Sequence, residues 1–400
     1  MSIFTFGFAE ILFGLFGLSF FISKSAFTIF YSCLVIFGLI QYPWKFLGQA
    51  HWSEKTMIAL YPMAILCNFF SLGGVESSAL VFARWTWPLL FFPIMYLKNH
   101  KSSLIILAKT LVVSLFVACL YSYYQFYKEY NFIYDTNGRV SSFWDILRWS
   151  YFCSIAVIAL FTVLFTVLVQ ENSLVQLNKN EFRILMTVFV MSVVSLVLTN
   201  SRAAWLGSIL GIALSIIMQR KTLKYYVGLS IAVGLLLFTN DHIRSRMLST
   251  FNVQNKNGEI VSNHRSNASR LDMWKVAIDI SKESPFFGSG FENSKPTIEN
   301  FLSRQTADYV NKYTKLDYSF NDQHSSYITM LFQFGAIYTI ILYTLFFAVT
   351  WLNRRDVILI PLVMCTYFIY LFYGSIVSFE ASIGFGLISF MILNLKKTEA

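Results

Sequence analysis

One arginine stands where a charged side chain is unusual, between two long apolar runs. Arg202 lies in the stretch LTNSRAAWLG at 198–207. Arginine stays protonated and can hold two phosphate oxygens at once. At the start of a helix, free backbone N–H groups and the helix dipole would add to the same anion site. The residues alone leave two interpretations open: an anion-binding arginine, or an interfacial arginine whose charge reaches to water.

Three further side chains have comparable chemistry. Arg270 falls in the first turn of a helix predicted near 268–283. His324 stands where a polar region meets an apolar segment, and a helix N-terminus there would favour the neutral, proton-accepting imidazole. Arg84 lies inside an apolar segment, where a charge is costly. It either contacts an anionic substrate or headgroup, or pairs with an acid such as Glu380.

The elements that position these residues are predicted to be membrane-spanning helices. The 400 residues are 56% hydrophobic and only 13% charged, whereas soluble domains carry about a quarter charged residues. A spanning helix needs about 20 mostly apolar residues. The prediction is an all-α polytopic membrane protein with about twelve spans, at 4–22, 26–42, 57–72, 79–97, 104–127, 150–170, 182–199, 203–218, 223–239, 325–351, 356–376 and 379–395.

The distribution of lysine and arginine predicts the orientation of these helices. With the N-terminus in the cytoplasm, the inner loops and the tail hold most of the positive charges of the short connections, and the outer connections hold few. Both termini are therefore expected in the cytoplasm. The net charge of +10 then follows from topology and does not indicate a nucleic-acid partner.

The longest polar region is expected on the outer side of the membrane. It contains eleven basic and ten acidic residues, so any anion site in it depends on particular arginines. Its predicted helix has Asn267 as N-cap. The chain thus divides into nine spans in 1–239, a partly helical periplasmic loop at 240–324, and three spans with a cytoplasmic tail at 325–400.

Several function classes lack their motifs here. The sequence has no zinc-type Cys/His spacing, no DxD pair, no P-loop and no dinucleotide fingerprint, so a nucleotide-driven pump or a sugar-nucleotide enzyme is unsupported. The five cysteines all fall in predicted spans, which implies no exported disulfide scaffold. Five tryptophans are predicted at the membrane interface instead of as sugar platforms: Trp85, Trp87, Trp144, Trp149 and Trp205.

Three motifs, with the long outer loop before the last three spans, resemble those of the O-antigen ligase superfamily. They are TNSRAAWLG, SRLDMWKVAIDISKESPFFGSG and HSSYITMLFQFG, and they cover roughly residues 190–350. The superfamily also contains O-antigen polymerases and protein O-oligosaccharyltransferases. Many members have His-Asn where this chain has His324-Ser325.

The resemblance implies a lipid-donor, GT-C-type glycosyltransferase of the bacterial inner membrane that works in lipopolysaccharide biosynthesis. At the periplasmic face it would transfer a glycan from undecaprenyl diphosphate to a lipid A-core sugar. Arg202, Arg270 and Arg84 would bind the donor diphosphate. Arg202 and His324 would be catalytic, with His324 as general base. No metal, other cofactor or nucleic acid is expected, and membrane lipids are the remaining partners.

Two alternatives stay open. An O-antigen polymerase would join one lipid-linked repeat unit to another. A transporter of lipid-linked glycans belongs to a different class, in which inverted repeats and midplane polar residues are typical. The polar chemistry of this sequence gathers at the outer face, which favours an enzyme.

Overall fold

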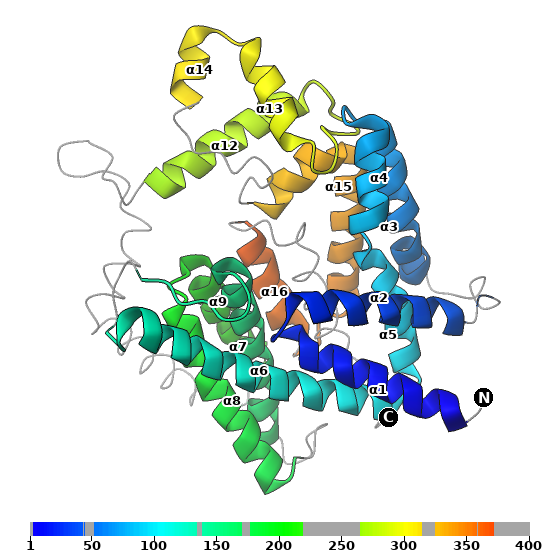
Figure 1. The fold of residues 1–400 in the computed structure, drawn as a ribbon, viewed down its shortest axis with the longest axis vertical. Helices are drawn as coiled ribbons and strands as arrows, with labels where there is room; N and C mark the ends of the chain where they lie inside the picture. The colour runs from blue at the N-terminus through cyan, green and yellow to red at the C-terminus, as the bar shows by residue number, and fades with distance from the viewer. Residues whose placement is uncertain are drawn as a thin grey trace.

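The computed structural model describes most of the chain and is all helical in that part (Figure 1). The all-α prediction is therefore confirmed for the described residues. His324, Glu380 and the predicted spans at 223–239 and 379–395 lie outside them. The described residues are 3–42, 44, 52–133, 138–169, 177–218, 265–313, 325–357 and 359–371.

The helices follow the predicted apolar segments closely. Those before the long polar region are α1 (Ile3–Phe20), α2 (Lys24–Gln41), α3 (Trp52–Phe69), α4 (Gly74–Arg84), the 3-10 helix η2 (Trp87–Leu90), α5 (Phe91–Lys98), α6 (Lys101–Tyr130), α7 (Ile146–Val169), α8 (Lys179–Leu198) and α9 (Arg202–Met218). The later ones are α12 (Arg265–Ser281), α13 (Ser294–Ser303), α14 (Ala307–Tyr313), α15 (Ser326–Leu352) and α16 (Leu359–Tyr370).

Many of these helices have the length and apolarity of membrane spans. Six described stretches can cross a bilayer, and four shorter apolar helices accompany them, among them α9 and α16. Large apolar side chains such as Phe8, Ile40 and Phe347 lie exposed on helix surfaces, as expected for contact with lipid. The chain is thus a multi-pass membrane protein, and the count of twelve spans stays a prediction.

Two predicted spans are interrupted. The segment predicted as 79–97 divides into α4, η2 and α5, and Pro88 stands at the start of η2. Proline has no N–H to donate, so it favours a new helix start over a continuous helix. The second interruption lies in α15 at Gly335, whose φ of 72° and ψ of 179° are not helical.

The helices pack in groups around a large apolar core. α1 packs against α2 and α6, and α7 packs against α8 and α9. α9 also packs along α16, while α15 packs against α3 and α12 (Figure 1). α12, α13 and α14 lie together at one end of the molecule, at the top of Figure 1, where α12 packs against α15.

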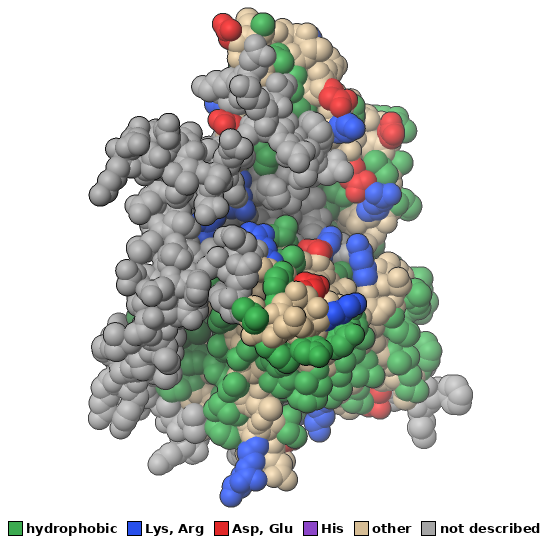
Figure 2. Space-filling view, turned by 60° about the vertical axis from the view of Figure 1, so that its left-hand side comes forward, with side chains coloured by type: hydrophobic (Ala, Val, Ile, Leu, Met, Phe, Trp, Pro, Cys, Tyr) green, Lys and Arg blue, Asp and Glu red, His purple; other side chains and the backbone are tan. Residues whose placement is uncertain are grey.

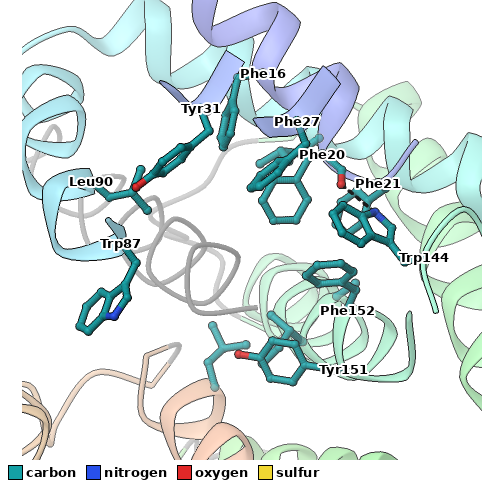
Figure 3. Packing of buried hydrophobic residues seen from close by; sticks show 14 of the residues in the cluster. Phe16, Phe20, Phe21, Phe27, Tyr31, Trp87, Leu90, Trp144, Tyr151 and Phe152 are labelled. Atoms are coloured by element: carbon teal, nitrogen blue, oxygen red, sulfur yellow. Dashed lines mark hydrogen bonds between the residues drawn. The ribbon is translucent and has the colours of Figure 1, made fainter. Parts of the chain in front are cut away.

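An aromatic cluster fixes the segment that leads into α7 (Figure 3). The Trp144 indole N–H donates to the Phe20 carbonyl at 3.0 Å. The Trp144 ring lies 5.9 Å from the Phe27 ring and 5.7 Å from the Phe152 ring, between centroids. The start of α7 is therefore bound to α1 and α2.

The five tryptophans predicted at the membrane interface are buried instead, each at most 6% exposed. Three of them donate their indole N–H to partners inside the protein: Trp85 to the Tyr338 hydroxyl at 3.0 Å, Trp144 as above, and Trp205 to a backbone carbonyl. The interface interpretation was wrong because helix packing encloses all five rings inside the molecule, and for these three it also supplies hydrogen-bond acceptors.

Candidate functional site

Three arginines from three separate segments line one cavity. Arg139, Arg202 and Arg270 surround a volume of about 60 Å³, which is room for a few water molecules or one small anionic group. No carboxylate is among the described residues of its wall. The other lining residues are Ile146, Leu147, Ser150, Asn200, Ser201, Ala203, Ala204 and Ile369. Two predicted site residues, Arg202 and Arg270, are thus brought together.

Arg202 is half-buried and opens α9. The carbonyl of Ser201 accepts the first helical bond, from the Trp205 N–H at 3.0 Å. The Trp205 indole in turn donates to the Leu196 carbonyl at 2.9 Å, which ties the first turn of α9 to the end of α8. The first turn of α9 contains no acidic residue. Its N–H groups and dipole therefore favour an anion beside Arg202.

Small residues hold α9 tightly between α7 and α16. A Cβ on Gly207 would lie 2.8 Å from Cγ1 of Ile369, and one on Gly211 would lie 2.5 Å from Cδ1 of Ile158. The hydroxyl oxygens of Ser154 and Ser208 are 2.6 Å apart. Close approach through small residues is typical of helix contacts in membranes. The position of Arg202 is consequently set by backbone-to-side-chain packing.

Arg139 was not predicted from the sequence, and the fold brings it to the cavity through its neighbours. The Asn200 side-chain amide donates to the carbonyl of Gly138 at 3.0 Å. The Val140 N–H donates to the carbonyl of Leu198 at 3.0 Å. These two bonds join the segment 138–140 to the turn before α9. Arg139 and Arg202 therefore share one backbone support.

The turn has a left-handed residue at its centre. Asn200 has φ of 53°, a conformation that asparagine tolerates better than most residues. This geometry directs the chain from α8 into α9 within three residues. It also places the Asn200 amide against the segment 138–140.

The N-terminus of α7 also borders the cavity, but a carboxylate already occupies it. Oδ1 of Asp145 accepts the N–H groups of Leu147 at 3.1 Å and Arg148 at 3.0 Å. Its Oδ2 forms an ion pair with the Arg148 guanidinium. Asp145 is thus the N-cap of α7. Both helices lack an acid in the first turn, but the N-terminal N–H groups of α7 are already capped by the Asp145 carboxylate.

Arg270 is presented by α12, which packs on α15. Val276, Ala277 and Ile280 are buried against Phe332 of α15, so the C-terminal half of α12 is fixed. The predicted helix is confirmed, but it begins at Arg265. Asn267 consequently lies inside the helix and is not the N-cap. Polar residues that can cap are frequent in this stretch, so the sequence alone does not choose among them.

An ionic cluster closes the end of α12. The carboxylate of Asp279 accepts from Lys282 at 2.7 Å, from Lys275 at 2.9 Å and from the Tyr309 hydroxyl at 3.0 Å. Partial burial alone would raise the pKa of Asp279, but these three hydrogen bonds outweigh it and hold that pKa below its usual value. The cluster links α12 to α14.

Arg84 lies elsewhere among the described residues. It ends α4, and its guanidinium forms an ion pair with the carboxylate of Glu292. It does not line the cavity. Its predicted contact with the donor stays a prediction, and Glu380, the acid considered as its partner, lies outside the described residues.

His324 also lies outside the described residues, so its role as general base stays a prediction. The described chain resumes at Ser325, whose carbonyl accepts the Thr329 N–H at 2.9 Å. α15 begins at the next residue, Ser326.

The face turned forward in Figure 2 carries lysine and arginine side chains, with acidic side chains among them, above a broad hydrophobic surface. The apolar surface suits lipid contact, and the basic side chains suit an anionic group held beside it.

A comparison with protein families matches residues 187–343 to the family described as O-Antigen ligase. The match covers less than half of the chain. It includes Arg202, Arg270 and His324, and it leaves Arg84 and Arg139 outside. A comparison with curated proteins finds no match.

Proposed function

We propose that the chain, which the O-antigen ligase family model matches over residues 187–343, is a member of the O-antigen ligase superfamily that transfers an O-antigen glycan from undecaprenyl diphosphate to a lipid A-core sugar. Enzymes of this family act on lipid-linked glycans. The observation that carries the proposal is the meeting of Arg139, Arg202 and Arg270 at one cavity, at the N-terminus of α9.

The arginines act on the leaving group. Transfer breaks the bond between the anomeric carbon and a diphosphate oxygen, and the electron pair goes to that oxygen. The acceptor hydroxyl forms the new bond to the carbon and loses its proton. A diphosphate that bears a glycan has one negative charge on each phosphate, and the freed end gains more. Cations placed around this group stabilise the transition state more than the bound donor.

The remaining roles are assigned to His324 and to the membrane. His324 takes the proton of the acceptor hydroxyl. The lipid tail of the donor lies along the apolar surface beside the cavity. The reaction occurs at the periplasmic face of the inner membrane, with both chain termini in the cytoplasm.

Binding of undecaprenyl diphosphate to the purified protein in nanodiscs tests the arginines. Arg202→Gln and Arg139→Gln should each weaken binding by about 10-fold to about 100-fold, the cost of a lost hydrogen bond to a charged group. Arg304→Gln is the matched control, because Arg304 pairs with Glu283 at 2.9 Å and does not line the cavity. Unchanged binding in both cavity variants would contradict the proposal.

The rate of transfer distinguishes the general base, His324, from the arginines that bind the diphosphate. His324→Ala should leave undecaprenyl diphosphate binding intact and slow single-turnover transfer by about 10²-fold to about 10⁴-fold. Transfer should also proceed in excess EDTA, because the arginines meet the charge of the leaving group. Activity that is lost on chelation and restored by Mg²⁺ would overturn the metal-independent mechanism.

An O-antigen polymerase is the second candidate, because the superfamily contains both activities. Deletion of the gene and gel analysis of lipopolysaccharide distinguish them. Loss of a ligase leaves bare core and long polymer on the lipid carrier. Loss of a polymerase leaves core with single repeats. Binding of lipid-linked glycan without any transfer would instead favour a transporter.

A further inference from the structure

The break in α15 is filled by another segment of the chain. In a continuous helix the N–H groups of Ala336 and Ile337 would donate to carbonyls one turn earlier. Here Gly335 interrupts the helix, and the Ala336 N–H donates to the carbonyl of Pro285 at 2.9 Å. The Ile337 N–H donates to the carbonyl of Phe286 at 3.3 Å. The segment 285–290 thus supplies the acceptors that the broken helix lacks.

The same segment also supplies the missing donors. The Phe332 carbonyl accepts the Ser289 N–H at 2.7 Å and the Ser289 hydroxyl at 3.0 Å. The Gln333 carbonyl accepts the Gly290 N–H at 3.1 Å. Both N–H groups and both carbonyls of the two interrupted helical bonds are therefore satisfied by the segment 285–290. In a membrane protein such compensation is required wherever a helix is broken.

Glycine makes this contact sterically feasible. The φ and ψ of Gly335 lie in a region that essentially only glycine populates. A Cβ there would lie 2.3 Å from the carbonyl oxygen of Phe286, and a Cβ on Gly288 would lie 2.6 Å from the backbone nitrogen of Gly335. The two backbones meet with no space for a side chain between them.

The segment 285–290 begins four positions after the last residue of α12, the helix that carries Arg270. Arg270 stands seven positions before Ala277, which is buried against α15, so the arginine lies about 10 Å along the helix from this contact. A tilt of about 10° at the contact would move Arg270 by about 2 Å over that length. A misplacement of about 1 Å can cost a catalytic site about 100-fold in rate.

We propose that the segment 285–290, seated in the break of α15, is a positioning element that holds Arg270 at the arginine-lined cavity. This role rests on the proposed function, in which Arg270 contacts the diphosphate. The far side of the segment is held as well, because the Phe291 N–H donates to the Asn68 side chain at 2.6 Å and the Leu72 N–H donates to the Gly288 carbonyl at 3.2 Å.

A double-mutant cycle tests the coupling, with undecaprenyl diphosphate as the binding probe. Gly335→Ala and Arg270→Gln should each weaken binding by about 10-fold or more. The double variant should bind as weakly as either single variant, because a displaced Arg270 has no contact left to lose. Gly74→Ala is the matched control: Gly74 also has positive φ, 53°, but a Cβ there meets nothing within 4 Å.

The control should leave binding within about twofold of wild type. Gly335→Ala that binds like wild type, or whose effect multiplies with that of Arg270→Gln, overturns the positioning role. Arg270→Gln without effect does the same, while loss of binding in Arg202→Gln would still support the proposed function. A wild-type protein that does not bind the probe overturns the proposed function and the positioning role with it.

If Gly335→Ala does not fold, a milder variant tests the positioning role of the segment 285–290. Ser289→Ala removes one hydrogen bond to the Phe332 carbonyl and leaves the backbone contacts in place. It should weaken binding by about twofold to about tenfold in the wild-type background. It should have no effect in the Arg270→Gln background. Equal effects in both backgrounds, or none in either, overturn the proposal.

Discussion

Substitution of Gly207 by alanine tests whether close packing of α9 positions Arg202. The added Cβ would lie 2.8 Å from Cγ1 of Ile369 and 3.2 Å from Sγ of Cys365, both on α16. Both residues are almost fully buried, so neither has free space to move into. Ile369 also forms part of the cavity wall. Relief of the clash must therefore move α9, α16 or the wall of the site.

Two opposing contributions to the free energy of unfolding set the effect of Gly207→Ala on stability. Alanine in a helix interior is more favourable than glycine by about 1 kcal/mol. Overpacking of a tight contact costs about 1–3 kcal/mol. The net expectation is a destabilisation of about 0–2 kcal/mol. Gly7→Ala is the control, because a Cβ on Gly7 meets nothing within 4 Å, and it should raise the apparent Tm.

The effect on function should exceed the effect on stability. Arg202 stands five residues before Gly207, about 7.5 Å along the axis, so a shift of α9 moves the guanidinium with it. A displacement of about 1 Å would cost up to about 100-fold in single-turnover transfer. Thermal unfolding in detergent and transfer in nanodiscs measure the two effects.

A second substitution tests whether the clash with Ile369 causes the effect of Gly207→Ala. Gly207→Ala with Ile369→Ala removes the clashing atoms, so the double variant should lose less stability than the sum of the single variants. A Gly207→Ala protein as stable and as active as Gly7→Ala would show that close packing of α9 does not set the position of Arg202.

Three further predictions concern other contacts. Trp205→Phe replaces the buried indole by a smaller phenyl ring and removes the 2.9 Å hydrogen bond to the Leu196 carbonyl, so it should cost at least the contribution of that bond, about 0.5–1.5 kcal/mol, seen as a lower apparent Tm. Asp279→Asn should lower the hydrogen-exchange protection of α12 at neutral pH. The difference from wild type should fade as the pH falls below about 4, because a depressed pKa stabilises the fold only while the carboxylate is ionised. Arg84→Gln should change stability by less than about 1 kcal/mol, since the ion pair is exposed. If Arg84 also binds the donor, Arg84→Gln will weaken undecaprenyl diphosphate binding and Glu292→Gln will not.

The sequence predicts well the features that depend on the membrane environment and on the local periodicity of apolar residues. Ten of the twelve predicted spans overlap described helices, one of them divided into α4, η2 and α5, because an apolar run of that length has few other stable states in a membrane. The helix that carries Arg270 was predicted for a different reason, the helical spacing of its recurring apolar residues. The start of α9 at Arg202 follows from the polar turn before it.

The features that sequence does not predict depend on distant partners. Arg139 stands in a polar segment with no motif around it, and its place at the cavity comes from bonds to residues some 60 positions later. The break at Gly335 depends on carbonyls and N–H groups of the segment 285–290. A single glycine in an apolar run gives only a weak local signal for a break. Pro88, by contrast, was a usable signal for the interruption between α4 and α5.

A different set of contacts positions each of the three arginines of the cavity. Hydrogen bonds from Val140 and Asn200 place Arg139, small residues of α9 place Arg202, and the seat of the segment 285–290 in α15 places Arg270. None of these supports uses the guanidinium of the arginine it positions. Loss of an arginine charge should weaken anion binding while these supports stay in place. Loss of a support should weaken both together. An arginine variant that unfolds the protein would place that guanidinium among the structural contacts and remove it from the proposed site.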